Sequence, residues 1–119
     1  RKNLFSVALA GTTITHPTPQ TPAEWAARIV VRHPTLAAPV AKALALVESG
    51  HVHAAAGQVE VDGSDGANTY HLRYVEETGS WLCNCPAFLY RPVMIGRTAY
   101  CKHTLAVRIA VRAGLVKEN

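Results

Sequence analysis

Residues 21–50 carry apolar positions at helical spacing and predict two consecutive helices. The first helix begins at a capping box, in which Thr21 caps the backbone, Pro22 takes the first helical position and Glu24 reaches back to the cap. It ends at His33, because a residue that precedes proline avoids helical geometry.

The second predicted helix spans residues 36–49, with Thr35 as its cap and Gly50 as its left-handed stop. It is apolar nearly all round, since Lys42 and Glu48 are its only charged residues. A helix of this kind is buried on more than one side. We expect it to lie between the first helix and a sheet, and the alternative is contact with another chain.

After residue 50 the pattern changes to an alternation of apolar and polar positions, which is typical of strands. The period of two runs over residues 58–62 and 70–75, and residues 80–83 form a third strand. Turn-forming residues at 63–66 and 76–79 separate them. This pattern predicts a small antiparallel meander.

Residues 86–100 contain Pro92 and Gly96 without a clear period, so we expect a loop with at most one helical turn around residues 88–90. The last helix begins at or just after Cys101 and stops at Gly114. The predicted fold is therefore α+β, with two N-terminal helices, a small antiparallel sheet and a C-terminal helix.

A chain of 119 residues has room for one domain of ordinary size. We expect residues 1–20 to form an arm or linker, residues 21–50 a helical segment and residues 51–119 the rest of the same packed domain. The chain begins at Arg1 rather than Met, so we expect it to be part of a longer protein.

Two short pairs of residues predict a metal site. Cys83 and Cys85 come at the end of the third strand, where residues two apart point to the same face. Cys101 and His103 follow after a spacer of fifteen residues, at the start of the last helix. Three thiolates and a neutral imidazole suit a tetrahedral Zn²⁺ ion that has a structural role. We expect an acceptor near His103 to fix its tautomer. A disulfide is the weaker reading, because a Cys-x-Cys bridge is strained and the third cysteine would be unpaired.

These residues resemble the SWIM-type zinc finger, a Cys-x-Cys pair followed by a Cys-x-His pair at the head of a helix. The likeness covers roughly residues 69–113, with WLCNCPAF at residues 81–88 and CKHTLAV at residues 101–107. The segment from about residue 40 is similar to the region before the finger in some bacterial members. The resemblance implies a zinc-binding module that contacts DNA or protein and is not itself an enzyme.

Charge is concentrated in the half of the chain that carries the metal ligands. The net charge is +4, and residues 78–119 contain six Lys or Arg against one Glu. This balance favours an anionic partner such as DNA, and the alternative is a solvated basic surface. The candidate nucleic-acid contacts are Arg91, Arg97, Lys102, Arg108 and Arg112. Tyr90 and Tyr100 are candidates for stacking on bases.

A protein-interaction module that docks through the helix at residues 36–49 remains the rival function.

Other polar and aromatic residues suggest no second site. His51 and His53 could form half of a metal site, but no acid or cysteine completes it in sequence, and His71 has no companion. Trp25 and Trp81 fall on apolar stripes and are expected in the core. No apolar run is long enough to span a membrane, and metal-bound thiolates fit a cytoplasmic setting.

Overall fold

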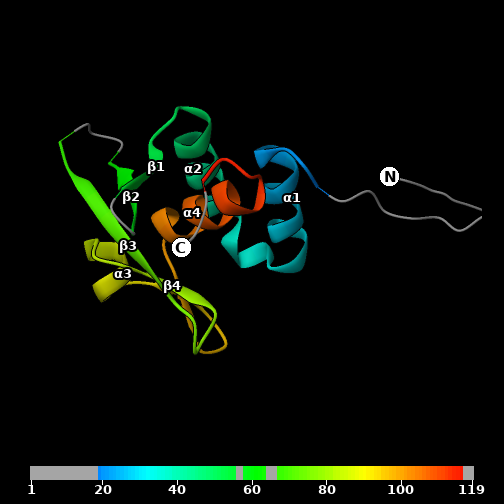
Figure 1. The fold of residues 1–119 in the computed structure, drawn as a ribbon. Coiled ribbons are helices and arrows are strands. Elements are labelled where there is room, and N and C mark those ends of the chain that lie inside the picture. Colours follow the sequence, from blue (N-terminus) through cyan, green and yellow to red (C-terminus); the bar gives the residue numbers. More distant parts are fainter. Residues whose placement is uncertain (1–18, 56–57, 64–66, 117–119) are drawn as a thin grey trace, which may run out of the picture.

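The computed structural model describes residues 19–55, 58–63 and 67–116, so the expected arm at residues 1–20 lies almost entirely outside them. Helices α1, α2 and α4 lie together on one side of an antiparallel sheet of order β1-β2-β3-β4 (Figure 1). The arrangement confirms the α+β class. The helical elements are α1 (Pro22–Arg32), a 3-10 turn η1 (Pro34–Leu36), α2 (Ala37–Glu48), α3 (Pro86–Tyr90) and α4 (Lys102–Arg112). The strands are β1 (Val52–Ala55), β2 (Gln58–Asp62), β3 (Thr69–Val75), β4 (Ser80–Cys83), β5 (Val93–Ile95) and β6 (Thr98–Tyr100).

Helix α1 begins and ends as predicted. The backbone N–H of Glu24 donates to Oγ1 of Thr21 at 3.2 Å, and the backbone N–H of Thr21 donates to Oε1 of Glu24 at 3.0 Å. These two bonds satisfy donors that the first turn of a helix leaves without partners. The helix stops at the C-cap His33, which precedes Pro34.

Helix α2 starts later than predicted, and the expected cap at Thr35 is wrong. The chain first makes the 3-10 turn η1, which buries Leu36, and α2 then begins without a side-chain cap. At the other end Gly50 adopts a φ of 78°, and its N–H donates to the carbonyl of Val47 at 3.2 Å. The left-handed stop predicted at Gly50 is therefore confirmed.

Helix α2 packs on α1 and α4, and α4 takes the place against the sheet where α2 was expected. Ala43 of α2 and Ala106 of α4 are both fully buried, and side chains of this size let helices approach closely. Val40, Leu46 and Val47 of α2 are buried within this chain, and the partly buried Leu44 packs against the same core, in line with the intramolecular interpretation of residues 36–49.

The sheet extends the predicted meander by one strand. β2, β3 and β4 follow the alternating segments, whereas β1 pairs with β2 and was not expected as a separate strand. The register places Val59 opposite Leu72 and Leu72 opposite Cys83, and all three side chains are buried. This buried row crosses the sheet and ends at a predicted metal ligand.

The helical turn predicted around residues 88–90 is present as α3, but the rest of the predicted loop at residues 86–100 contains a hairpin that was not expected. Helix α3 follows the first ligand pair, and β5 and β6 form a separate two-stranded hairpin that turns at Gly96, whose φ is 61°. Strands of three residues are too short to show a period in the sequence. The hairpin returns the chain to the second ligand pair.

Candidate metal centre

The four predicted metal ligands converge at the junction of three elements. Cys83 ends β4 and Cys85 is the N-cap of α3, while Cys101 is the N-cap of α4 and His103 lies in its first turn. All four side chains are buried, with at most 5% of any residue exposed. Within the described ranges, they are the one group of three or more such donors placed closely enough to hold an ion.

The distances between ligand atoms suit a single ion. The three sulfur atoms and the imidazole nitrogen all lie within 4.8 Å of one another. Nδ1 of His103 is 3.8 Å from Sγ of Cys83 and 4.0 Å from Sγ of Cys101. The three thiols are free of disulfides. A buried Cys₃His group that can hold a metal ion is therefore present.

Two of the sulfurs accept hydrogen bonds from helix N-termini. The backbone N–H of Phe88 donates to Sγ of Cys85 at 3.3 Å, and that of Thr104 donates to Sγ of Cys101 at 3.5 Å. Such bonds and the positive end of a helix stabilise sulfur as a thiolate. Oγ1 of Thr104 also accepts from the N–H of Cys101 at 3.0 Å, which holds the start of α4 in place.

The thiols cannot all ionise together without a cation. Hydrogen bonds from the thiols of Cys101 and Cys83, and from the N–H of Phe88, hold the pKa of Cys85 well below its usual range. Hydrogen bonds with Cys101 and Cys85, together with burial, raise the pKa of Cys83. A bound cation would lower the pKa of all the thiol ligands together, because it favours the thiolate form of each one. The residues present therefore fit a metal ion.

The His103 ring is oriented by packing rather than by the acceptor that we expected from the sequence. It lies against the ring of Tyr70, with centroids 4.4 Å apart and planes inclined by 30°. Nδ1 faces the sulfurs, and Nε2 is buried without a hydrogen-bond partner among the described residues. Coordination through Nδ1 would place the ring proton on Nε2.

Asn84, between the first two ligands, was missed by the sequence analysis. Its side-chain Oδ1 accepts a hydrogen bond of 3.1 Å from the backbone N–H of His71 on β3. This bond ties the Cys-x-Cys segment to the neighbouring strand. Nothing in the sequence pairs these two residues, because their proximity depends on the register of β3 with β4.

The predicted basic residues do not form one group. Arg108 and Arg112 line a common cavity on α4, whereas Arg91 follows α3, Arg97 lies in the turn between β5 and β6, and Lys102 begins α4. Sequence reasoning missed two further basic residues at that cavity, Arg28 and Arg32 of α1. They lie about 80 positions from Arg108 and Arg112 in the chain, and no local signal links them.

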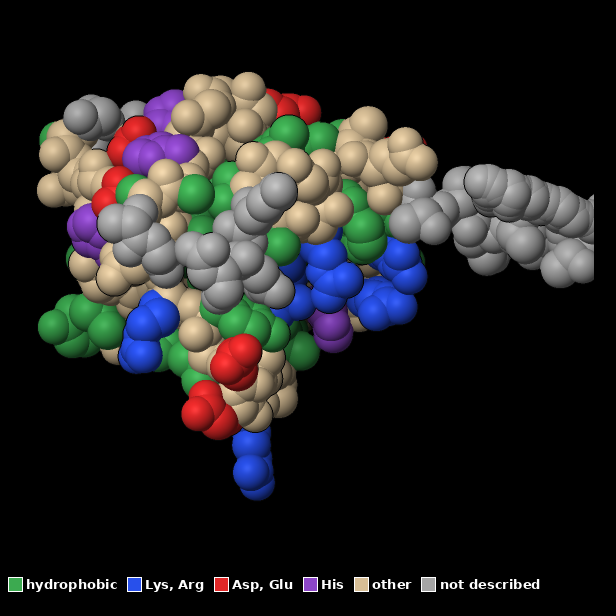
Figure 2. All heavy atoms as spheres, viewed as in Figure 1, with side chains coloured by type: hydrophobic (Ala, Val, Ile, Leu, Met, Phe, Trp, Pro, Cys, Tyr) green, Lys and Arg blue, Asp and Glu red, His purple; other side chains and the backbone are tan. Residues whose placement is uncertain are grey.

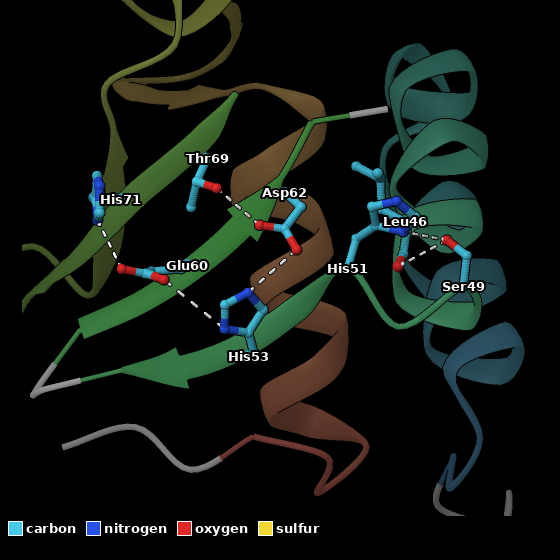
Figure 3. Close-up of polar contacts among 8 residues, drawn as sticks. All are labelled: Leu46, Ser49, His51, His53, Glu60, Asp62, Thr69 and His71. Atoms are coloured by element: carbon cyan, nitrogen blue, oxygen red, sulfur yellow. Dashed lines mark hydrogen bonds and ion pairs between the residues drawn. The ribbon is translucent and has the colours of Figure 1, made fainter. Parts of the chain in front are cut away.

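His53 and His71 have companions, contrary to the prediction. Figure 3 shows both rings beside carboxylates of β2: His53 Nε2 lies 3.4 Å from Asp62 Oδ2, and His71 Nδ1 lies 3.2 Å from Glu60 Oε2. Asp62 also accepts a 2.9 Å hydrogen bond from Thr69, which lowers its pKa. Antiparallel pairing brings these side chains together across three strands. They form cross-strand pairs, and their donor atoms do not converge on one point as the cysteines do.

No family model, no curated protein and no solved structure matches this chain. In the part of the chain that the structure describes, no helix is long and apolar enough to cross a membrane.

Proposed function

We propose that this chain is a SWIM-type module in which Cys83, Cys85, Cys101 and His103 bind one Zn²⁺ ion. The donor set supports zinc, because soft thiolates with one imidazole in tetrahedral array are typical of it. Zinc bonds of about 2.3 Å to sulfur and about 2.0 Å to nitrogen place those atoms about 3.5 Å apart in a regular tetrahedron. The separations of 3.8 and 4.0 Å from His103 to Cys83 and Cys101 are close to this value.

The zinc ion in this proposal is structural. Four protein ligands complete a tetrahedron and leave no position for water or substrate. The ligands also come from a strand end and two helix starts, so the ion joins β4, α3 and α4. A role in catalysis has no support in this arrangement, and we propose a binding module rather than an enzyme.

We further propose that the module binds DNA through α4. One observation carries this proposal: α4 starts at two metal ligands, and its outer side carries Arg108 and Arg112 without an acidic partner. No Asp or Glu in the described ranges forms an ion pair with either residue. Uncompensated arginines on a fixed helix are available to bind phosphate groups.

Replacing both arginines, Arg108→Ala with Arg112→Ala, is expected to weaken DNA binding by at least about tenfold at 0.1 M salt. The slope of log K against log salt should fall in magnitude by about 2, because the variant makes two fewer phosphate contacts and therefore releases fewer counterions. Fluorescence anisotropy of a labelled duplex, titrated at several salt concentrations, measures both quantities.

The matched control is Lys42→Ala with Arg73→Ala, which removes the same charge from α2 and β3. Neither residue lines the α4 cavity, so the control should keep nearly all of the affinity. If the zinc-loaded wild-type chain does not bind DNA at low salt, the proposed function is wrong.

A protein-interaction module was the rival hypothesis, based on the apolar helix at residues 36–49. Val40, Leu46 and Val47 of α2 are buried inside this chain. The exposed apolar residues of that helix are alanines, which offer little surface for docking. The helix therefore gives no support for a protein partner, and DNA remains the better-supported proposal.

A further inference from the structure

A cavity of about 200 Å³ lies between α1 and α4, and its lining is unusually rich in arginine. Two of the four guanidinium groups come from each helix: Arg28 and Arg32 from α1, and Arg108 and Arg112 from α4. We call this cavity and its four arginines the arginine groove. Helix α1 lies outside residues 69–113, so half of the groove comes from sequence beyond the SWIM resemblance.

The arginine groove lacks a counter-charge within the described chain. Its lining contains no Asp or Glu, and none of its arginines forms an ion pair with a described carboxylate. Glu24 is the one acid on α1, and its carboxylate accepts hydrogen bonds from the backbone N–H and the hydroxyl of Thr21 at the helix cap. Figure 2 shows Lys and Arg side chains gathered on this side of the molecule without an Asp or Glu among them. Four like charges around one cavity repel each other unless an anion is bound there.

Aromatic rings hold three of the four guanidinium groups in place. Arg28 and Arg112 lie 5.6 and 5.7 Å from the ring centre of Trp25, and Arg108 lies 5.8 Å from that of Tyr100. Cation–π contact limits the motion of the side chains and keeps their N–H groups free to donate. Trp25, expected in the core, packs against the core half-buried and also forms a wall of the groove. The same contacts occupy the ring of Tyr100, which argues against its predicted role in stacking on bases.

Arg108 and Arg112 also line a neighbouring cavity, which adds no further Lys or Arg. This second cavity, of about 340 Å³, reaches Tyr74 and Trp81 on the sheet. Glu76 and Glu77, the acids of the nearby turn between β3 and β4, line neither cavity. A ligand with several regularly spaced anionic groups matches these four arginines better than one isolated ion does.

We propose that the arginine groove binds the phosphodiester backbone of DNA and does not read base sequence. This inference rests on the DNA-binding function proposed above and adds α1 to the contact surface. Guanidinium groups match phosphate oxygens in bidentate geometry, and phosphate contacts position a duplex without carrying sequence information. Side chains that read base sequence reach the base edges inside a groove of the duplex, whereas these four arginines line a cavity between two helices.

The test uses the full zinc-loaded chain and two fluorescein-labelled 16-base-pair duplexes of unrelated sequence. The groove variant is Arg28→Gln with Arg32→Gln, and the control is Lys42→Gln with Arg73→Gln, which removes equal charge away from both cavities. We expect the groove variant to bind both duplexes about tenfold or more weakly, with a salt slope smaller by about 2. The control should stay within about threefold of wild type, and the wild type should bind the two duplexes equally within about threefold.

Two further measurements separate the possible outcomes. Without DNA, the groove variant should melt at or above the wild-type temperature, because the substitutions remove repulsion; this result also shows that it folds. Polyglutamate of equal charge should compete poorly for the wild type. If the groove variant binds DNA as the control does, the groove assignment is overturned while DNA binding stands. Competition by polyglutamate equal to that by DNA, or a strong preference for one duplex, also overturns the proposal.

Discussion

Removing zinc from the loaded chain with a chelator is expected to unfold the sheet and α4 together. Zinc contributes about 10–16 kcal/mol to small domains folded around such sites, whereas a whole domain is stable by only about 5–15 kcal/mol. Cys83 ends the buried row that crosses the sheet, and Cys101 starts the central helix, so loss of the ion frees both elements at once. Loss of near-ultraviolet circular dichroism and of amide hydrogen-exchange protection in β4 and α4 would record the change. One equivalent of Zn²⁺ should restore both signals.

A pair of histidine substitutions provides the control for this result. His103→Ala removes a buried ligand and should reproduce the metal-free state even when zinc is present. His71→Ala removes a half-exposed ring that pairs with Glu60 on the outer face of the sheet, and it should leave zinc binding unchanged. A chelated chain that keeps its exchange protection, or equal effects of the two substitutions, would contradict a structural role for the ion.

Truncating Leu72 is expected to cost about 2–5 kcal/mol of folding free energy even with zinc bound. This side chain is fully buried on β3, directly opposite Val59 and Cys83, so Leu72→Ala leaves a cavity in the row that supports the metal site. Leu82→Ala is the matched control, because Leu82 is 40% exposed on the adjacent strand. It should change stability by less than about 1 kcal/mol.

Urea denaturation at a fixed free zinc concentration measures both variants, since bound metal shifts apparent stability by mass action. If the two leucine substitutions cost the same, the core assigned to the inner face of the sheet is wrong.

Local chemistry explains which features could be predicted from the sequence. The capping box at Thr21 and the stop at Gly50 depend on neighbouring residues only, and both are confirmed. Cys83 and Cys85 converge with Cys101 and His103 as predicted. The geometry behind the first pair differs from the prediction, because β4 ends at Cys83 and Cys85 is the N-cap of α3 rather than a second strand residue. The helix caps depend on residues close together in the chain, and the two ligand pairs can be linked because cysteine and histidine at this spacing bind one metal ion.

Relations that depend on register or tertiary packing could not be predicted. His53 meets Asp62, and His71 meets Glu60, only because three strands pair in one particular alignment. The arginine groove needs α1 to pack beside α4, and the helices are separated by the whole sheet in sequence. The β5–β6 hairpin was missed because three residues are too few for a period. The predicted boundaries of the segments 1–20, 21–50 and 51–119 stay predictions.

The central claim is that one zinc ion lies in a closed site made of Cys83, Cys85, Cys101 and His103. X-ray absorption spectroscopy at the zinc edge, on protein loaded with one equivalent, tests it most directly. The expected spectrum has three sulfur atoms at about 2.3 Å and one nitrogen at about 2.0 Å, without a further oxygen ligand. A first shell with fewer than three sulfur atoms, or with a bound water, would contradict the account.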